Sequence, residues 1–126
     1  MIYDAFNGDA DGLCALHQLR LDKPAQTTLI TGVKRDIALL KQIQPEAGDE
    51  IVALDIAVEK NTGPLLAALQ KGVRVRWFDH HNPGELPVHA NFSATIDAAA
   101  DVCTSLLVNR HLQGRHLPWA VAAAFG

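Results

Sequence analysis

The chain has 126 residues, of which 48% are hydrophobic and 20% are charged. This composition is typical of a soluble globular protein with one hydrophobic core, and the length excludes two domains of ordinary size. The formal net charge of -3 excludes a general electrostatic attraction to a long phosphate backbone. A nucleic-acid substrate would therefore be short, or would be held by something outside this chain.

The N-terminus lacks the pattern of a secretory signal, because Asp4 comes almost at once and no basic start precedes an apolar run. No apolar stretch approaches the ~20 residues of a membrane span. We therefore expect a cytoplasmic protein without a membrane partner. Cys14 and Cys103 lie in apolar contexts without zinc-site spacing, and we expect two buried free thiols.

Short apolar runs alternate with amphipathic stretches in chain order. The first half predicts strands at residues 2–6, 27–31 and 50–56, a polar turn at 7–12, and helices at 13–21 and 35–43. The second half predicts a helix at 59–71 closed by Gly72, a strand at 73–78, a strand at 92–96, a helix at 101–112 and an apolar segment at 117–125. This alternation predicts an α/β fold: a mostly parallel sheet with helices on both faces.

Acidic and histidine residues stand at three of the predicted strand ends: Asp9 and Asp11 after the first strand, Asp55 at the third, and Asp79, His80 and His81 after the fourth. In an open parallel sheet these strand ends share one edge, where ligands bind. Carboxylate oxygens and imidazole nitrogens suit Mn²⁺ or Mg²⁺, and several acids packed without a cation would raise one another's pKa. We expect one or two metal ions here, with Asp55 as the bridge between two.

Three motifs resemble those of a known family. They are Asn-Gly-Asp-Ala-Asp-Gly at 7–12, Val-Ala-Leu-Asp at 52–55 and Asp-His-His at 79–81. In order and spacing they resemble the first three motifs of the DHH phosphoesterase superfamily, over roughly the first eighty residues. That superfamily includes RecJ-type exonucleases, oligoribonuclease and nucleotide phosphatases, cyclic-dinucleotide phosphodiesterases and family II pyrophosphatases.

The resemblance implies a role for each motif residue. It implies that Asp9, Asp11, Asp55 and His80 bind metal, that His81 faces the substrate phosphate, and that Asp79 orients a neighbouring group. It also implies hydrolysis of a phosphate ester by a water that Mn²⁺ or Mg²⁺ activates. The acidic chain favours a nucleotide or short oligonucleotide as substrate over long DNA. The assembly state stays open, with a homodimer among the options.

Two departures from the family pattern bear on activity. Asn7 stands where many relatives have His or Asp, and we expect it to hydrogen bond water or substrate instead of binding metal strongly. Relatives supply a further aspartate some fifty residues beyond the histidine pair, about where this chain ends. We therefore expect residues 1–126 to be one truncated DHH-type domain with poor or no catalysis by itself.

Each motif also has a purely structural interpretation. The segment from Asp9 to Gly12 can be a turn that caps a helix, and Asp55 can be a strand-end acid bonded to backbone amides. His80 and His81 can lie idle in a solvated loop. The functional alternatives are a degenerate module that binds a nucleotide or a partner without hydrolysis, and an inorganic pyrophosphatase.

The remaining candidates are interpreted as structural. We expect the other histidines to be surface or packing residues: His17, His89, His111 and His116. We expect Lys34 and Arg35 to be solvated charges, although phosphate binding is an alternative. We expect four aromatic residues to belong to the core, because basic residues do not alternate with them: Trp77, Phe78, Trp119 and Phe125.

Overall fold

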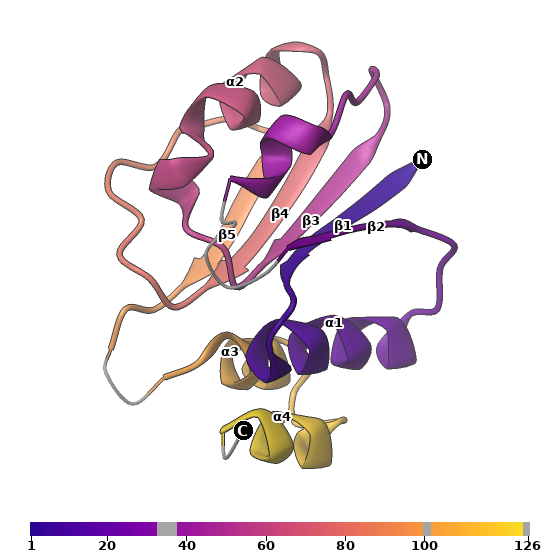
Figure 1. Cartoon of the computed structure of the whole chain (residues 1–126), viewed down its shortest axis with the longest axis vertical. Coiled ribbons are helices and arrows are strands. Elements are labelled where there is room, and N and C mark those ends of the chain that lie inside the picture. The colour runs from indigo at the N-terminus through magenta and orange to yellow at the C-terminus, as the bar shows by residue number, and fades with distance from the viewer. Residues whose placement is uncertain (33–37, 100–101, 125–126) are drawn as a thin grey trace.

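The computed structural model describes residues 1–32, 38–99 and 102–124. Its centre is a five-stranded parallel sheet (Figure 1). Its strands are β1 (Ile2–Asn7), β2 (Thr28–Gly32), β3 (Glu50–Leu54), β4 (Arg74–Asp79) and β5 (Phe92–Ile96). They lie in the order β2-β1-β3-β4-β5, and every pairing is parallel. The predicted α/β class with a parallel sheet is confirmed.

Helices cover both faces of this sheet (Figure 1). One face carries α1 (Ala10–Asp22) and α3 (Thr104–His111), and α4 (Leu117–Ala124) packs on both of them as an outer layer. The other face carries α2 (Thr62–Gln70) and the short 3-10 helices η1 (Leu39–Gln42) and η2 (Val58–Lys60). None of the described helices is long and apolar enough to cross a membrane.

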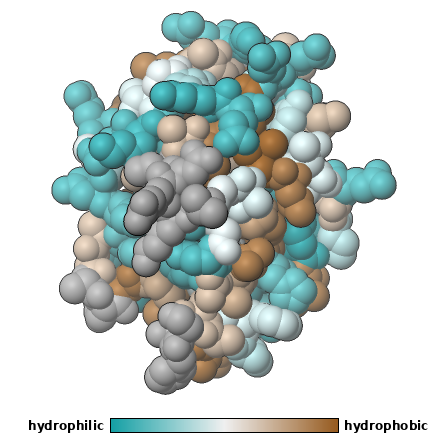
Figure 2. Space-filling model, viewed as in Figure 1, coloured by the Kyte–Doolittle hydropathy of each residue, from teal (hydrophilic) through white to brown (hydrophobic). Residues whose placement is uncertain are grey.

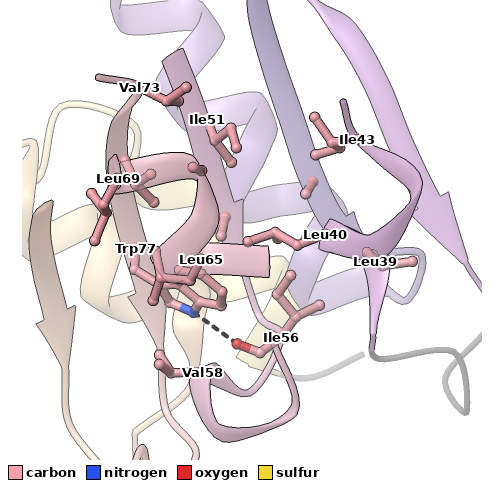
Figure 3. Close-up of a cluster of buried hydrophobic side chains, with 14 residues drawn as sticks. Leu39, Leu40, Ile43, Ile51, Ile56, Val58, Leu65, Leu69, Val73 and Trp77 are labelled. Carbon is pink, nitrogen blue, oxygen red and sulfur yellow. Dashed lines mark hydrogen bonds between the residues drawn. The ribbon is translucent and has the colours of Figure 1, made fainter. Parts of the chain in front are cut away.

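The strand β3 shows why an uninterrupted apolar run belongs in the middle of the sheet. Successive side chains point to opposite faces, so Ile51 and Ala53 pack toward α2 while Val52 and Leu54 pack toward α1 and α3. Trp77 lies in the core beneath α2, where its Nε1 donates a hydrogen bond to the carbonyl of Ile56 at 2.8 Å (Figure 3). Both faces of the sheet are thus buried against helices.

Several predicted element bounds are corrected. Of the predicted helix at 35–43 the structure describes residues 38–43, which contain the 3-10 helix η1, and Lys34 and Arg35 lie outside the described residues. The predicted helix at 59–71 divides into η2 and α2, whereas Gly72 has the predicted left-handed backbone, with φ of 86°. The turn at 7–12 is shorter than predicted, because α1 begins at Ala10.

Two predictions of burial are wrong. Trp119 is 42% exposed on α4, where its ring meets the ring of His17 edge-on at 4.3 Å between centroids. Cys14 and Cys103 are free thiols as predicted, but both are only partly buried. Trp77 and Phe78 are core residues as predicted, and Phe125 lies outside the described part. Hydrophilic residues cover much of the face in Figure 2, with hydrophobic ones between them.

Candidate metal centre

The predicted site residues follow the ends of three neighbouring strands. The parallel register places Phe6 beside Leu54, and Leu54 beside Phe78. The residues that come next, Asn7, Asp55 and Asp79, therefore leave the sheet at one edge. This is the convergence that the sequence pattern predicts.

Asp55 occupies the centre of this edge. The strand β3 ends one residue earlier, and Asp55 takes a left-handed backbone with φ of 61°, which is uncommon for a residue with a side chain. The side chain is buried, and its Oδ1 accepts a hydrogen bond from Oγ1 of Thr104 at 3.0 Å and lies 3.1 Å from Nε2 of His80. Burial, together with the negative charges of Asp11 and Asp9, raises the pKa of Asp55 to about 9.

The two aspartates of the first motif have different settings on α1. Asp9 is the N-cap of the helix, and its Oδ1 accepts a hydrogen bond from the backbone N–H of Gly12 at 3.0 Å. The capping interpretation of Asp9 is thus confirmed, while its charge also reaches Asp55. Asp11 lies in the first turn of α1, with Oδ2 at 3.8 Å from Nε2 of His80. Its carboxylate also accepts hydrogen bonds from the first two backbone N–H groups of α3.

A glycine is required where this loop enters α1. A Cβ atom at Gly12 would lie 2.0 Å from the carbonyl oxygen of Asn7, a separation that no packing allows. The backbone between Asn7 and Gly12 is therefore folded tightly on itself, which brings Asp9 and Asp11 back over the edge of the sheet. The Gly in the first motif follows from this close approach.

Asp79 and His81 form a pair. Asp79 is fully buried, and its Oδ1 lies 2.7 Å from Nδ1 of His81, whose side chain is 47% exposed. Burial raises the pKa of Asp79, and the neighbouring His81 opposes that shift. The contact restrains the imidazole ring through Nδ1 and leaves Nε2 directed away from Asp79.

Four side chains in this region can hold a metal ion: Asp55, Asp79, His80 and His81. Each offers one ligand atom, and these atoms all lie within 4.8 Å of one another. The set shares Asp55 and His80 with the ligands that the sequence predicts. Asp9 and Asp11 are not members of this group but lie next to it. The negative charge of Asp9 helps to raise the pKa of Asp55, and Oδ2 of Asp11 lies 3.8 Å from Nε2 of His80.

The chemistry of these residues fits a divalent cation. Carboxylate oxygens and imidazole nitrogens are ligands for Mn²⁺ and Mg²⁺, and thiolates are absent from the group. Oδ2 of Asp79 and Oδ1 of Asn7 are buried, and neither has a hydrogen-bond partner among the described residues. A buried carboxylate oxygen without a partner is costly even though the other oxygen of Asp79 meets His81, and a bound cation would offset that cost.

Sequence reasoning missed Thr104 and Ser105, which meet Asp11 and Asp55 from the start of α3. They belong to the predicted helix at 101–112, and nothing in that segment marks them as site residues. Their contacts with Asp11 span 93 and 94 residues of sequence. A Thr-Ser pair at the first turn of a helix is itself only a weak signal, because both residues are common there for capping alone.

No protein-family model and no curated protein matches this sequence. The structure, however, is similar to that of the exonuclease RecJ bound to manganese, with a TM-score of 0.63 and 19% identity over 98% of this chain. The chain has a RecJ-like fold. It is also similar to RecJ from Thermus thermophilus in complex with Mn²⁺, with a TM-score of 0.58 and 21% identity over 97% of this chain.

The similarity covers 38% of the first RecJ chain and 20% of the second, so this chain spans less than half of either protein. At this level of identity the comparison concerns the fold. It shows that the architecture carrying the three sequence motifs is shared with RecJ. The roles of the individual site residues stay predictions.

Proposed function

We propose that this chain forms the metal centre of a hydrolase that cleaves phosphate esters of nucleotides or short oligonucleotides. The observation that carries the proposal is the setting of Asp55, which is buried at the edge of the sheet between His80 and the aspartates of the first motif. Burial and the charges of Asp11 and Asp9 raise the pKa of this carboxyl group to about 9, and a cation beside it would stabilise the ionised form. The RecJ-like fold supports the same chemistry by analogy.

The metal ions, for which we propose Mn²⁺ or Mg²⁺, would be held by the predicted ligands: Asp9, Asp11, Asp55 and His80. Two such ions, when bound, supply an activated water and positive charge for a phosphoryl group. Asp55 is the proposed bridge, because its carboxyl group is the member of the set that lies between the acids of α1 and His80.

His81 is the proposed contact to the substrate phosphate. Its ring is held through Nδ1 by the buried Asp79, so Nε2 is the nitrogen that can donate a hydrogen bond to a phosphate oxygen or hold a proton there. Asp79 is proposed to act by orienting this ring. Asn7, whose side-chain oxygen is buried without a partner among the described residues, is proposed to bind a water or the substrate at the same edge.

The substrate class follows from charge. The chain has a formal net charge of -3, and the acids of the site add local negative charge. A long polyanion would be repelled over most of its length, whereas one phosphate at the metal would not. We therefore propose a nucleotide or a short oligonucleotide as substrate.

Calorimetric titration of Mn²⁺ tests the centre. The parent chain should bind Mn²⁺ with a micromolar dissociation constant, and Asp55→Ala and His80→Ala should each abolish binding. Asp49→Asn is the matched control, because Asp49 lies just before β3, at the opposite edge of the sheet, where it contacts the N-terminal amine. Failure of the parent to bind Mn²⁺, or equal binding by Asp55→Ala, would refute the proposal.

Hydrolysis assays separate the functional alternatives. The Mn²⁺-loaded chain is mixed with bis(p-nitrophenyl) phosphate, a dinucleotide and inorganic pyrophosphate. Release of nitrophenol from the first ester, or of a mononucleotide from the dinucleotide, lost in His81→Ala, supports the phosphoesterase. Turnover of pyrophosphate alone would indicate a pyrophosphatase. Mn²⁺ binding with no turnover would agree both with a non-catalytic module and with the poor catalysis expected of residues 1–126 by themselves.

A further inference from the structure

Thr104 contacts two of the proposed metal-binding carboxylates at once. It is the first residue of α3 and is fully buried. Its backbone N–H donates to Oδ2 of Asp11 at 3.1 Å, and its hydroxyl donates to Oδ1 of Asp55 at 3.0 Å. One residue therefore connects a carboxylate of α1 with the carboxylate at the end of β3.

The start of α3 is itself fixed against α1. The N–H of Ser105 donates to Oδ1 of Asp11 at 2.8 Å, so the two oxygens of Asp11 accept from two successive backbone N–H groups. Two turns further along α1, the buried Gln18 donates from Nε2 to the hydroxyl of Ser105 at 2.8 Å and to its carbonyl at 3.0 Å. The hydroxyl of Thr104 is thus held at a set position relative to both aspartates.

This position matters because Thr104 is the residue that contacts both carboxylates, while Asp11 is also held by the N–H of Ser105 and Asp55 also lies 3.1 Å from Nε2 of His80. A buried acid rotates or takes up a proton unless hydrogen bonds fix its orientation, and a ligand that is free to rotate binds metal less tightly. The Thr104 hydroxyl donates to Oδ1 of Asp55, the oxygen that also lies 3.1 Å from Nε2 of His80, and so restricts the rotation of the carboxylate. It has no acid or base role in this arrangement.

We propose that Thr104 is a positioning residue, whose hydroxyl fixes the carboxylate of Asp55 in the orientation that binds Mn²⁺, beside the Asp11 carboxylate that its backbone N–H holds. The inference rests on the proposed metal centre and adds a residue to it that no sequence motif contains. It predicts that the hydroxyl group, and not only the helix around it, controls affinity for the metal.

The test compares Thr104→Val and Thr104→Ala, which both remove the hydroxyl group, with Thr104→Ser, which keeps it. Mn²⁺ affinity is measured by calorimetry, and the electron paramagnetic resonance spectrum of bound Mn²⁺ reports its coordination. We expect Thr104→Val and Thr104→Ala to weaken binding about tenfold or more and to change the spectrum. Thr104→Ser should retain most of the affinity and the parent spectrum.

The matched control is Thr62→Val, the same change at the first residue of α2, where the hydroxyl meets only backbone carbonyls. It should leave Mn²⁺ affinity unchanged. Parent-like affinity in both Thr104→Val and Thr104→Ala would overturn the inference, and so would a Thr104→Ser variant as weak as these two. Circular dichroism of the metal-free variants separates loss of affinity from loss of fold, and Thr104→Ala keeps the test open if valine does not fit.

The two proposals fail in different ways. If the parent binds Mn²⁺, Asp55→Ala does not, and both hydroxyl-deleting variants bind like the parent, the metal centre stands and the role of Thr104 is refuted. If the parent itself binds no Mn²⁺, the proposed function is refuted and the positioning role with it.

Discussion

The two faces of the sheet differ in how their buried polar groups are arranged. Beneath α2 the core is almost wholly apolar, and the Trp77 indole in it is paired with the backbone carbonyl of Ile56. Between α1, α3 and the sheet, buried polar groups instead connect distant segments, from Gln18 through the start of α3 to Asp55. The first face stabilises the fold, and the second also holds carboxylates in place. Variants matched across the two faces test this division.

Trp77→Ala should have the largest effect on stability. It removes a fully buried indole and its hydrogen bond to Ile56, and such a deletion costs about 3–5 kcal/mol. Urea unfolding measures the loss. Because the change is on the α2 face, the folded fraction should still bind Mn²⁺ with parent affinity; a large loss of affinity in that fraction would show that the two faces do not act separately.

Gly12→Ala should destabilise the protein by about 1–3 kcal/mol, because the added Cβ would collide with the carbonyl oxygen of Asn7 and force the backbone apart. The same shift should weaken Mn²⁺ binding, since Asp9 and Asp11 lie on this turn. Gly63→Ala on α2 is the control: a Cβ there meets nothing within 4 Å, so stability should be unchanged or slightly higher. Equal effects of the two substitutions in thermal unfolding would contradict the account.

The pH dependence of protein stability should reveal the raised pKa of the buried Asp55. In the metal-free protein the pKa of Asp55 is about 9, against 3.8 for the ordinary group, so the folded state binds a proton that the unfolded state releases. The contribution of Asp55 to the free energy of unfolding should therefore be complete below about pH 3.8 and decline as the pH rises to 9. Asp55→Asn should flatten this decline in urea unfolding between these pH values, and an unchanged slope would speak against the shift.

Adding Mn²⁺ should reverse that trend. The cation competes with the proton on Asp55, so apparent Mn²⁺ affinity should rise with pH up to about 9. Calorimetry in buffers of different ionisation enthalpy should detect proton release on binding. Binding without proton release at pH 7 would show that Asp55 is already ionised in the metal-free protein.

Gln18→Met should have the smallest effect of the series. It replaces the buried amide that anchors Ser105 with an apolar side chain of similar length, at a cost of about 1 kcal/mol. We expect a slight loss of Mn²⁺ affinity, smaller than that of Thr104→Val, because the hydroxyl on Asp55 is kept. A loss larger than that of Thr104→Val would mean that Gln18, and not Thr104, dominates the positioning.

Much of the fold is predictable because its signals are local. The apolar run at 50–56 and the strand at 2–6 are buried on both faces, so hydrophobicity alone reveals them, and acids that interrupt such runs at their ends mark the edge that carries the site. The predicted helix at 35–43 has an apolar stripe, but within this stretch the structure describes only residues 38–43, where a short 3-10 helix forms.

The parts that could not be predicted depend on contacts distant in sequence. The link between Thr104 and Asp55 spans 49 residues, and no periodicity or motif encodes it. Trp119 has a large apolar side chain of the kind expected in a core. However, α4 packs on α1 and α3 so that this ring contacts His17 on one side and stays partly exposed. Tertiary packing decides whether an aromatic residue on the outer helix α4 faces the core or the solvent.

The most direct test of the central claim is a crystal structure of the chain grown with Mn²⁺, with anomalous diffraction recorded at the manganese absorption edge. The account predicts an anomalous peak at the edge of the sheet, within bonding distance of the carboxylate of Asp55 and Nε2 of His80. No peak there, or a peak only at surface carboxylates while Asp55 and His80 stay paired with each other, would contradict it.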